Sequence, residues 1–167
     1  MGILTTDFRV SLAKAQAAAT NVWGAIGRTA AWPNELDPPA EVVGTVAIDT
    51  PIGYKKILTK QLVVQDAGGA IQFKNQNYTL VDPADAFDQN VVRVFLEFSF
   101  DYDEVPLSSF RQIGIYSGLV PTAGNELALV LLPSQVANAG GLIYYDNRLK
   151  EDRFIDKKNI LRRIIQF

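Results

Sequence analysis

The chain has 167 residues, of which 48% are hydrophobic, 16 are basic and 18 are acidic, so its formal net charge is -2. This length and apolar content are sufficient for one folded domain with a buried core. The near-neutral charge gives no electrostatic reason to expect nucleic acid and no polybasic membrane signal, so we expect neither partner.

Histidine and cysteine are both absent from the sequence. Without cysteine the chain forms no disulfide, zinc thiolate site or iron–sulfur cluster, and without histidine it has no Ser-His-Asp triad or HExxH zinc site. An enzyme would have to work with carboxylates, lysine or tyrosine. The sequence therefore favours a protein that is not an enzyme and that uses no cofactor or metal. The longest strongly apolar run, residues 127–132, is too short to cross a bilayer.

The N-terminal segment is predicted to be a short amphipathic helix over residues 6–19. Thr6 is the expected N-cap, and the apolar positions Phe8, Leu12 and Ala15 or Gln16 fall near one face. Such a short helix needs a partner for its apolar face.

A strand over residues 22–26 and a loop over residues 27–40 come after the helix. The loop is punctuated by Pro33, Pro38 and Pro39. We therefore divide the chain into residues 1–40, an N-terminal helix, short strand and proline-rich docking loop, and residues 41–167, an antiparallel β domain.

The rest of the chain has the pattern of β-strands. Alternation is clearest over residues 91–102, where every second residue from Val92 to Phe100 is apolar. Further strands are predicted over residues 56–65, 70–80, 110–116, 126–132, 141–145 and 159–167. Turns rich in Gly, Asn and Pro separate them. The fold class is therefore mainly β: an antiparallel β-sandwich or barrel-like module with a short N-terminal α-helix and a proline-rich loop. The apolar last strand is expected to pair within its own sheet or against a partner.

Two acidic clusters are the candidates for chemistry. Asp101 and Asp103 would share one face at the end of a strand, where a carboxylate pair can bind a cation or hydrolyse a glycosidic bond. The favoured interpretation is that they are solvated turn residues. Asp82, Asp85 and Asp88 lack the glycine and final glutamate of an EF-hand loop, so a short turn with capping aspartates is expected there.

Aromatic and basic residues near the proline-rich loop are the candidates for an interface. A tryptophan on such a loop is favoured at protein interfaces, and prolines lower the entropy cost of docking. The alternative is that Trp32 folds back onto its own sandwich. Arg28 and Arg111 are suited to bidentate contacts with carboxylates of a neighbour, or equally to pairs within the chain. The candidate interface residues are Trp23, Arg28, Trp32, Pro33, Pro38, Pro39, Arg111 and Phe167.

Three short parts of the sequence resemble baseplate wedge proteins of contractile-tailed bacteriophages. The first combines an IGR tripeptide with Trp32-Pro-Asn-Glu and Asp37-Pro-Pro, the second is an FRQIG strand, and the third is a DNR segment followed by a closing Ile-Ile-Gln-Phe. In this chain they are residues 25–28, 32–35 and 37–39, then 110–116, then 145–148 and 164–167.

The resemblance implies a β-rich virion protein without catalytic residues. It would be present in multiple copies, assembled in the host cytoplasm into the tail baseplate, with tube, sheath, wedge or hub subunits as partners. Its role would be to help couple host contact to sheath contraction. The chain is shorter than the large wedge subunits, which leaves its exact position in the baseplate open.

Two alternatives to a baseplate subunit arise from the residues. A receptor- or carbohydrate-binding β-sandwich of a tail fibre would place aromatic side chains such as Trp32 or Tyr145 along a groove. A carboxylate-based hydrolase would depend on Asp101 and Asp103.

Overall fold

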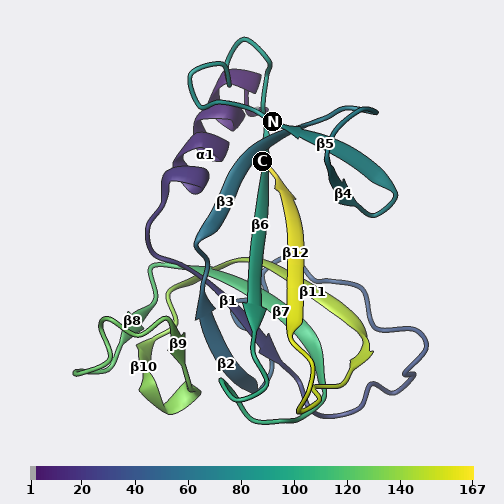
Figure 1. Cartoon of the computed structure of the whole chain (residues 1–167), viewed down its shortest axis with the longest axis vertical. Coiled ribbons are helices and arrows are strands. Elements are labelled where there is room, and N and C mark those ends of the chain that lie inside the picture. Colours follow the sequence, from purple (N-terminus) through teal and green to yellow (C-terminus); the bar gives the residue numbers. More distant parts are fainter. Residues whose placement is uncertain (1–2) are drawn as a thin grey trace. The chain divides into compact units, whose positions relative to one another are not determined.

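The computed structural model describes residues 3–167, and the chain divides into two compact units (Figure 1). Unit 1 comprises Met1–Thr20, Leu58–Glu97 and Leu161–Phe167, and unit 2 comprises Asn21–Ile57 and Phe98–Ile160. One N-terminal helix and antiparallel sheets confirm the predicted mainly β fold class. The division of the chain at residue 40 into a docking segment and a β domain stays a prediction.

Unit 1 combines helix α1 (Thr6–Ala18) with a sheet whose strand order is β12-β6-β3-β5-β4. Pairs β3–β6, β3–β5 and β4–β5 run antiparallel. Val63, Tyr78 and Phe95 form a buried cluster in this unit. The strands are β3 (Thr59–Gln65), β4 (Ile71–Phe73), β5 (Gln76–Leu80), the first part of β6 (Arg93–Phe100) and most of β12 (Asn159–Gln166).

Helix α1 lies along β3, but it begins and packs differently from the prediction. Thr5, not Thr6, is the N-cap, and its side chain accepts a hydrogen bond from the backbone N–H of Phe8 at 3.3 Å. The buried positions are Val10 and Ala13, whereas Phe8 is half exposed. The predicted apolar face was therefore wrong, because the side of the helix that carries its smaller apolar residues is the one packed.

Two of the predicted strands are interrupted in the structure. Residues 70–80 form the hairpin β4–β5, because Lys74 and Asn75 both take positive φ angles, 46° and 61°, as a type I′ turn requires. Residues 56–65 are divided between β2 (Pro51–Lys56) and β3, and the backbone N–H of Ile57 donates to the carbonyl of Val22.

Unit 2 is built on a second sheet with the strand order β11-β7-β1-β2-β9. Its central strand β1 (Val22–Gly27) is buried throughout and pairs antiparallel with β2 and with β7 (Phe110–Ser117). β9 (Val130–Leu131) is shorter than the predicted strand over residues 126–132, and β11 (Gly141–Glu151) is longer than the predicted 141–145. A further, two-stranded sheet pairs β8 (Val120–Pro121) with β10 (Val136–Asn138). Strand β10 comes directly after the 3-10 helix η1 (Pro133–Gln135).

The core of unit 2 surrounds β1. Trp23 is buried in it and donates its indole N–H to the side-chain oxygen of Asn21 at 2.7 Å. Tyr54 and Tyr116 meet edge to face with ring centroids 5.7 Å apart. Burial, and then the neighbouring Tyr116, raises the pKa of Tyr54 to about 12. The buried cluster consists of Trp23, Ala25, Ile48, Tyr54, Tyr116, Leu119 and Leu131.

Gly24 of β1 lies tightly against the ring of Phe98 in the same unit. A Cβ atom at Gly24 would lie 2.4 Å from ring atoms of Phe98, which is closer than real contacts allow. We expect Gly24→Ala to lower the free energy of unfolding by about 1–3 kcal/mol through overpacking. Chemical denaturation of both single variants and of Gly24→Ala/Phe98→Leu provides the check. The loss in unfolding free energy of the double variant should be smaller than the sum of the losses of the two single variants. Strict additivity would contradict the proposed contact.

Candidate functional site

The β1–β2 loop, residues 28–50 of unit 2, is closed at its base by Arg28 and Asp49. The backbone N–H of Arg28 donates to the carbonyl of Asp49 at 2.6 Å, and its guanidinium donates to the Asp49 carboxylate at 2.8 Å. The same guanidinium lies over the Trp32 ring, 3.9 Å from the ring centroid. This stacking is a cation–π contact that fixes the first turn of the loop.

An ion pair between a buried arginine and a partly exposed glutamate fixes the loop to the sheet. Arg111 of β7 is buried, and its Nε donates to both carboxylate oxygens of Glu35 at 2.9 and 3.0 Å. Its Nη1 donates to the carbonyl of Thr29 at 2.7 Å. The Glu35 carboxylate and the Thr29 carbonyl thus provide the partners that a buried guanidinium needs.

Glu35 also receives a hydrogen bond from the loop itself. The backbone N–H of Trp32 donates to its carboxylate at 2.9 Å. The hydrogen bond from Arg111, followed by the one from Trp32, holds the pKa of Glu35 below its usual value. The ionised carboxylate therefore joins the loop and strand β7 around neutral pH.

Trp32 lies inside the unit, as the alternative of a ring folded back onto its own chain describes. Its side chain is 7% exposed, and its indole N–H donates to the carbonyl of Arg148 on β11 at 2.8 Å. Trp23 is buried in the core of the same unit. Their expected part in an interface stays a prediction.

Strands β7 and β11 hold the second half of the loop. Asn147 donates its backbone N–H to the Glu41 carboxylate at 2.9 Å and its side-chain amide to the carbonyl of Pro39 at 2.8 Å. Gln112 of β7 accepts from the N–H of Asp49 at 2.7 Å and donates to the Asn147 side chain at 2.8 Å. The Tyr145 hydroxyl contacts the backbone of Val42.

Those parts of the resemblance that belong to unit 2 meet in one place, whereas the closing residues 164–167 belong to unit 1. Arg111 and Gln112 belong to the FRQIG strand, Tyr145, Asn147 and Arg148 to the DNR segment, and each of them contacts the β1–β2 loop. The resemblance of short motifs pointed to these residues. It did not show that the FRQIG strand and the DNR segment position the IGR…W…PP segment.

The outward side of the loop carries four exposed apolar side chains that sequence reasoning missed. These residues, Leu36, Val42, Val43 and Val46, form the outer patch and are 88%, 66%, 102% and 81% exposed. Their spacing in sequence follows neither the period of a strand nor that of a helix. The only sequence signal for an interface is that several apolar residues occur in a loop rich in proline and glycine. Pro33 and Pro39 of the same loop are exposed, and Pro38 is half-buried.

The outer patch lies in a segment with acidic but no basic residues. Between Arg28 and Lys55 the chain contains no lysine or arginine, whereas Asp37 and Glu41 lie between Leu36 and Val42 in sequence. Arg28 and Arg111, two candidate interface cations, already pair with Asp49 and Glu35 of their own unit.

Phe167, the last candidate, lies in unit 1. Its backbone N–H donates to the carbonyl of Val92 at 2.9 Å, and its own carbonyl accepts from the Nε of Arg9. Strand β12 next to it pairs with β6 of the same chain. The C-terminal strand is therefore paired within its own chain, and a role of Phe167 in an interface stays a prediction.

The acidic clusters lie in turns. Asp101 comes after the end of β6 and pairs with Lys158 at 3.3 Å, and Asp103 is exposed in the next turn. Asp82 accepts from the N–H of Ala84 at 2.8 Å, as a capping aspartate does. Among residues 3–167, no group of three or more His, Cys, Asp and Glu side chains is arranged to hold a metal ion. No helix within this range has the length and apolar character needed to cross a membrane.

Comparison with known proteins agrees with the motif resemblance. A family model described as "Baseplate wedge 3 tail fiber network component" matches residues 1–167. The protein named "Virion protein 3" of Enterococcus phage phiEF24C is 33% identical over 138 residues, which cover 79% of this chain and 76% of that protein. Both findings indicate a phage virion component, and they confirm the resemblance to phage baseplate proteins.

The lowered pKa of Glu35 makes the β1–β2 loop sensitive to acid. Because the pKa is lower in the folded chain, Glu35 stabilises the fold fully above its unfolded-state pKa, and this stabilisation is lost as the pH falls through the folded-state value. We expect acrylamide quenching of Trp32 fluorescence to increase over that acid range. Glu35→Gln should show increased quenching already at pH 7. The Trp32→Phe variant gives the quenching of Trp23 alone, which serves as the background. If Glu35→Gln were quenched no more than the wild type at pH 7, the role of the ion pair would be contradicted.

Proposed function

Because this chain belongs to the family of baseplate wedge 3 tail fiber network components, we propose that it is a structural subunit of a contractile phage tail. In this proposal it assembles into the baseplate through protein–protein interfaces and acts on no substrate. The β1–β2 loop is its docking element, and the outer patch is the surface that meets a neighbour.

The observation that carries the proposal is an ordered loop with apolar side chains directed to solvent. On its inner side, the loop is fixed by the Arg111–Glu35 pair, by the Trp32 indole and by Asn147. On its outer side, Leu36, Val42, Val43 and Val46 are exposed. A surface that is already ordered loses little conformational entropy when it binds, and exposed apolar groups gain from burial.

The candidate residues of the sequence analysis then have two kinds of role. Pro33, Pro38 and Pro39 border the outer patch and take part in the contact. Arg28, Trp32 and Arg111 act from beneath, because their side chains hold the loop in shape. Trp23 acts through the core on which β1 depends.

The tail-fibre alternative, a carbohydrate-binding sandwich, receives less support from these contacts. Its candidate stacking surfaces were Trp32 and Tyr145. The Trp32 ring is covered by Arg28, and the Tyr145 hydroxyl contacts the loop backbone at Val42. A carboxylate-based hydrolase is likewise disfavoured, because Asp101 pairs with Lys158 in a turn.

The partners in this proposal are tube, sheath, wedge or hub subunits of the same tail. Multiple copies join each particle during assembly in the host cytoplasm. In the baseplate, the subunit helps to couple host contact to sheath contraction. The contacts exchanged when the baseplate changes state are its weak polar contacts with neighbouring subunits.

We expect the variant Val43→Asp/Val46→Asp, introduced into the phage genome, to lower incorporation of the chain into particles at least about tenfold, because the contact would then bury charge. Ile155→Asp, an exposed apolar residue elsewhere in the same unit, is the matched control and should assemble normally. Mass spectrometry of purified particles measures incorporation, and electron microscopy measures the share of tails that contract on host cells. Normal incorporation and contraction of the patch variant would contradict the proposal.

A further inference from the structure

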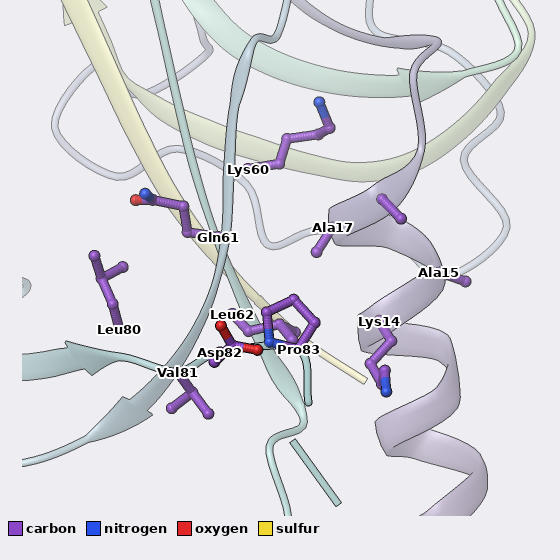
Figure 2. A pocket seen from close by; sticks show the side chains of 11 residues that line it. Lys14, Ala15, Ala17, Lys60, Gln61, Leu62, Leu80, Val81, Asp82 and Pro83 are labelled. Carbon is purple, nitrogen blue, oxygen red and sulfur yellow. The ribbon is translucent and has the colours of Figure 1, made fainter. Parts of the chain in front are cut away.

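Unit 1 contains two pockets whose walls differ in chemistry. The larger one, about 700 Å³, lies between α1, β3 and the segment after β5, and Figure 2 shows Ala17 on its helix side with Leu62, Val81 and Pro83 on its strand side. The smaller one, about 420 Å³, lies at the β4–β5 hairpin. Apolar walls accept any apolar group, whereas polar groups in a wall select a ligand by its hydrogen bonds. The smaller pocket therefore restricts its ligand more closely.

This hairpin pocket is lined almost entirely by side-chain amides. Five of its six lining residues are asparagine or glutamine, the sixth is alanine, and none of the six carries a charge. They come from the end of β3, the β3–β4 turn, β4, the β4–β5 turn and the start of β5. The lining residues are Gln65, Ala67, Gln72, Asn75, Gln76 and Asn77.

Three of these amides are available to a ligand. The side chains of Gln65, Gln72 and Asn75 are exposed and form no hydrogen bond within the described residues 3–167. Each amide provides two N–H donors and an acceptor oxygen. The pocket thus offers donors and acceptors that only water or a ligand can pair.

The other two amides of the hairpin pocket have partners within the unit. Asn77 donates its side-chain amide to the carbonyl of Ala67 at 3.0 Å, which holds the β3–β4 turn against β5. The oxygen of Gln76 accepts from the Tyr78 hydroxyl at 2.7 Å. Because only the oxygen is engaged there, the amino group of Gln76 is oriented and still has donors.

The charged residues next to the pocket in sequence are engaged elsewhere. The Asp66 carboxylate accepts from the Thr79 hydroxyl at 2.8 Å and from the N–H of Gly68 at 3.1 Å. Lys74 lies over the Phe73 ring, with its amino nitrogen 5.7 Å from the ring centroid. Neither Asp66 nor Lys74 lines the pocket, so its walls are polar but neutral.

The β4–β5 turn has a side chain where glycine would cost less. Lys74 and Asn75 have φ angles of 46° and 61°, in the left-handed region that disfavours side chains. A type I′ turn favours glycine at the second of these positions. Unfavourable backbone conformations are concentrated at functional sites, and here the side chain kept in place of glycine supplies one of the three available amides.

The amides determine the chemical class of the ligand. A charged ligand would lose hydration without meeting an opposite charge, and an apolar ligand would leave the amides unpaired. An extended peptide needs wall space for its side chains, and the only apolar lining residue is Ala67. Hydroxyl groups both donate and accept hydrogen bonds without carrying charge, so they match the amides.

We propose that the hairpin pocket binds a neutral saccharide, whose hydroxyl groups form hydrogen bonds with the amides of Gln65, Gln72 and Asn75. The volume of the pocket lies within the range of about 300–1,000 Å³ that is typical of small-ligand sites. The site differs from that of the tail-fibre alternative, because Trp32 and Tyr145 belong to unit 2.

Binding to the hairpin pocket should be weak. Each hydrogen bond to the sugar replaces one to water, so a few of them give a dissociation constant in roughly the millimolar range. Such a site becomes effective when many copies meet one polysaccharide together. Its use by the phage therefore rests on the proposed function, in which many copies join one particle, whereas binding by the free chain does not.

Two variants of the full chain each remove one amide. Asn75→Gly also introduces the residue that a type I′ turn favours, so the hairpin should stay folded. Its matched control is Asn90→Gly, because Asn90 is likewise exposed in unit 1, has a φ of 51° and lies outside the pocket lining. Gln72→Met keeps the length of the side chain without the amide, and Gln89→Met is its control at an exposed position outside the lining.

Two-dimensional NMR spectra follow the side-chain amides of the full chain directly, while glucose, galactose or N-acetylglucosamine is added to about 100 mM, well above the expected dissociation constant. At least one of these sugars should shift the amide signals of Gln65, Gln72 and Asn75 but not those of Gln89 and Asn90. Asn75→Gly and Gln72→Met should each weaken binding about two- to tenfold, the share of one hydrogen-bonding group, while both controls bind like the wild type.

The inference is overturned if none of the three sugars shifts these signals, or if Asn75→Gly and Gln72→Met bind as well as their controls. Galacturonate should bind no more tightly than galactose, and tighter binding would contradict a neutral ligand. Acetyl-tetraglycine amide should leave the signals unchanged, and shifts larger than those with the sugars would identify a peptide site instead. If the sugars bind as expected while Val43→Asp/Val46→Asp enters particles normally, the proposed function falls and the saccharide site stands.

Discussion

The shape of the β1–β2 loop depends on a guanidinium that has been taken out of water. Arg111 lies buried on β7, and its charge is compensated by Glu35, which the chain reaches only when residues 28–35 fold back over the sheet. Once Glu35 is in place, it also receives the backbone N–H of Trp32, and the indole then meets β11. A single electrostatic requirement thus determines where the first half of the loop lies.

This arrangement reverses the usual distribution of polar and apolar groups in a loop. The carboxylates of Glu35 and Glu41, the N–H of Asp49 and the carbonyl of Pro39 face inward, where β7 and β11 provide hydrogen-bond partners. Ile48 is buried in the core, whereas four other aliphatic side chains of the loop are left exposed. Folding within the chain therefore satisfies the polar groups, and only association with another protein can bury the apolar ones. The chain belongs to a family of baseplate components, and in such an assembly a neighbouring protein can bury these apolar side chains.

The sequence predicted the features that depend on periodicity and on short motifs. The alternation over residues 91–102 identified β6, the motifs identified the phage family, and the absence of histidine argued against common catalytic sites. It could not predict the β4–β5 hairpin, because Lys74-Asn75 lacks the glycine that usually marks a type I′ turn. It also missed the outer patch, since four separate aliphatic residues in a loop have no period. For Trp32 it left surface and interior equally open, and only the structure shows the carbonyl on β11 that binds the indole inside.

The way unit 1 is divided along the chain has a consequence for its synthesis. The sheet of this unit combines residues 58–97 with a strand from residues 161–167, and Arg9 near the start reaches the carbonyl of Phe167. Contacts so distant in sequence close slowly, because a long loop must be ordered before they form. The ribosome must also have released residue 161 before β12 can pair with β6. Helix α1 and β3 therefore stay incompletely covered until residues 161–167 have been synthesised, and chaperones have that interval in which to act.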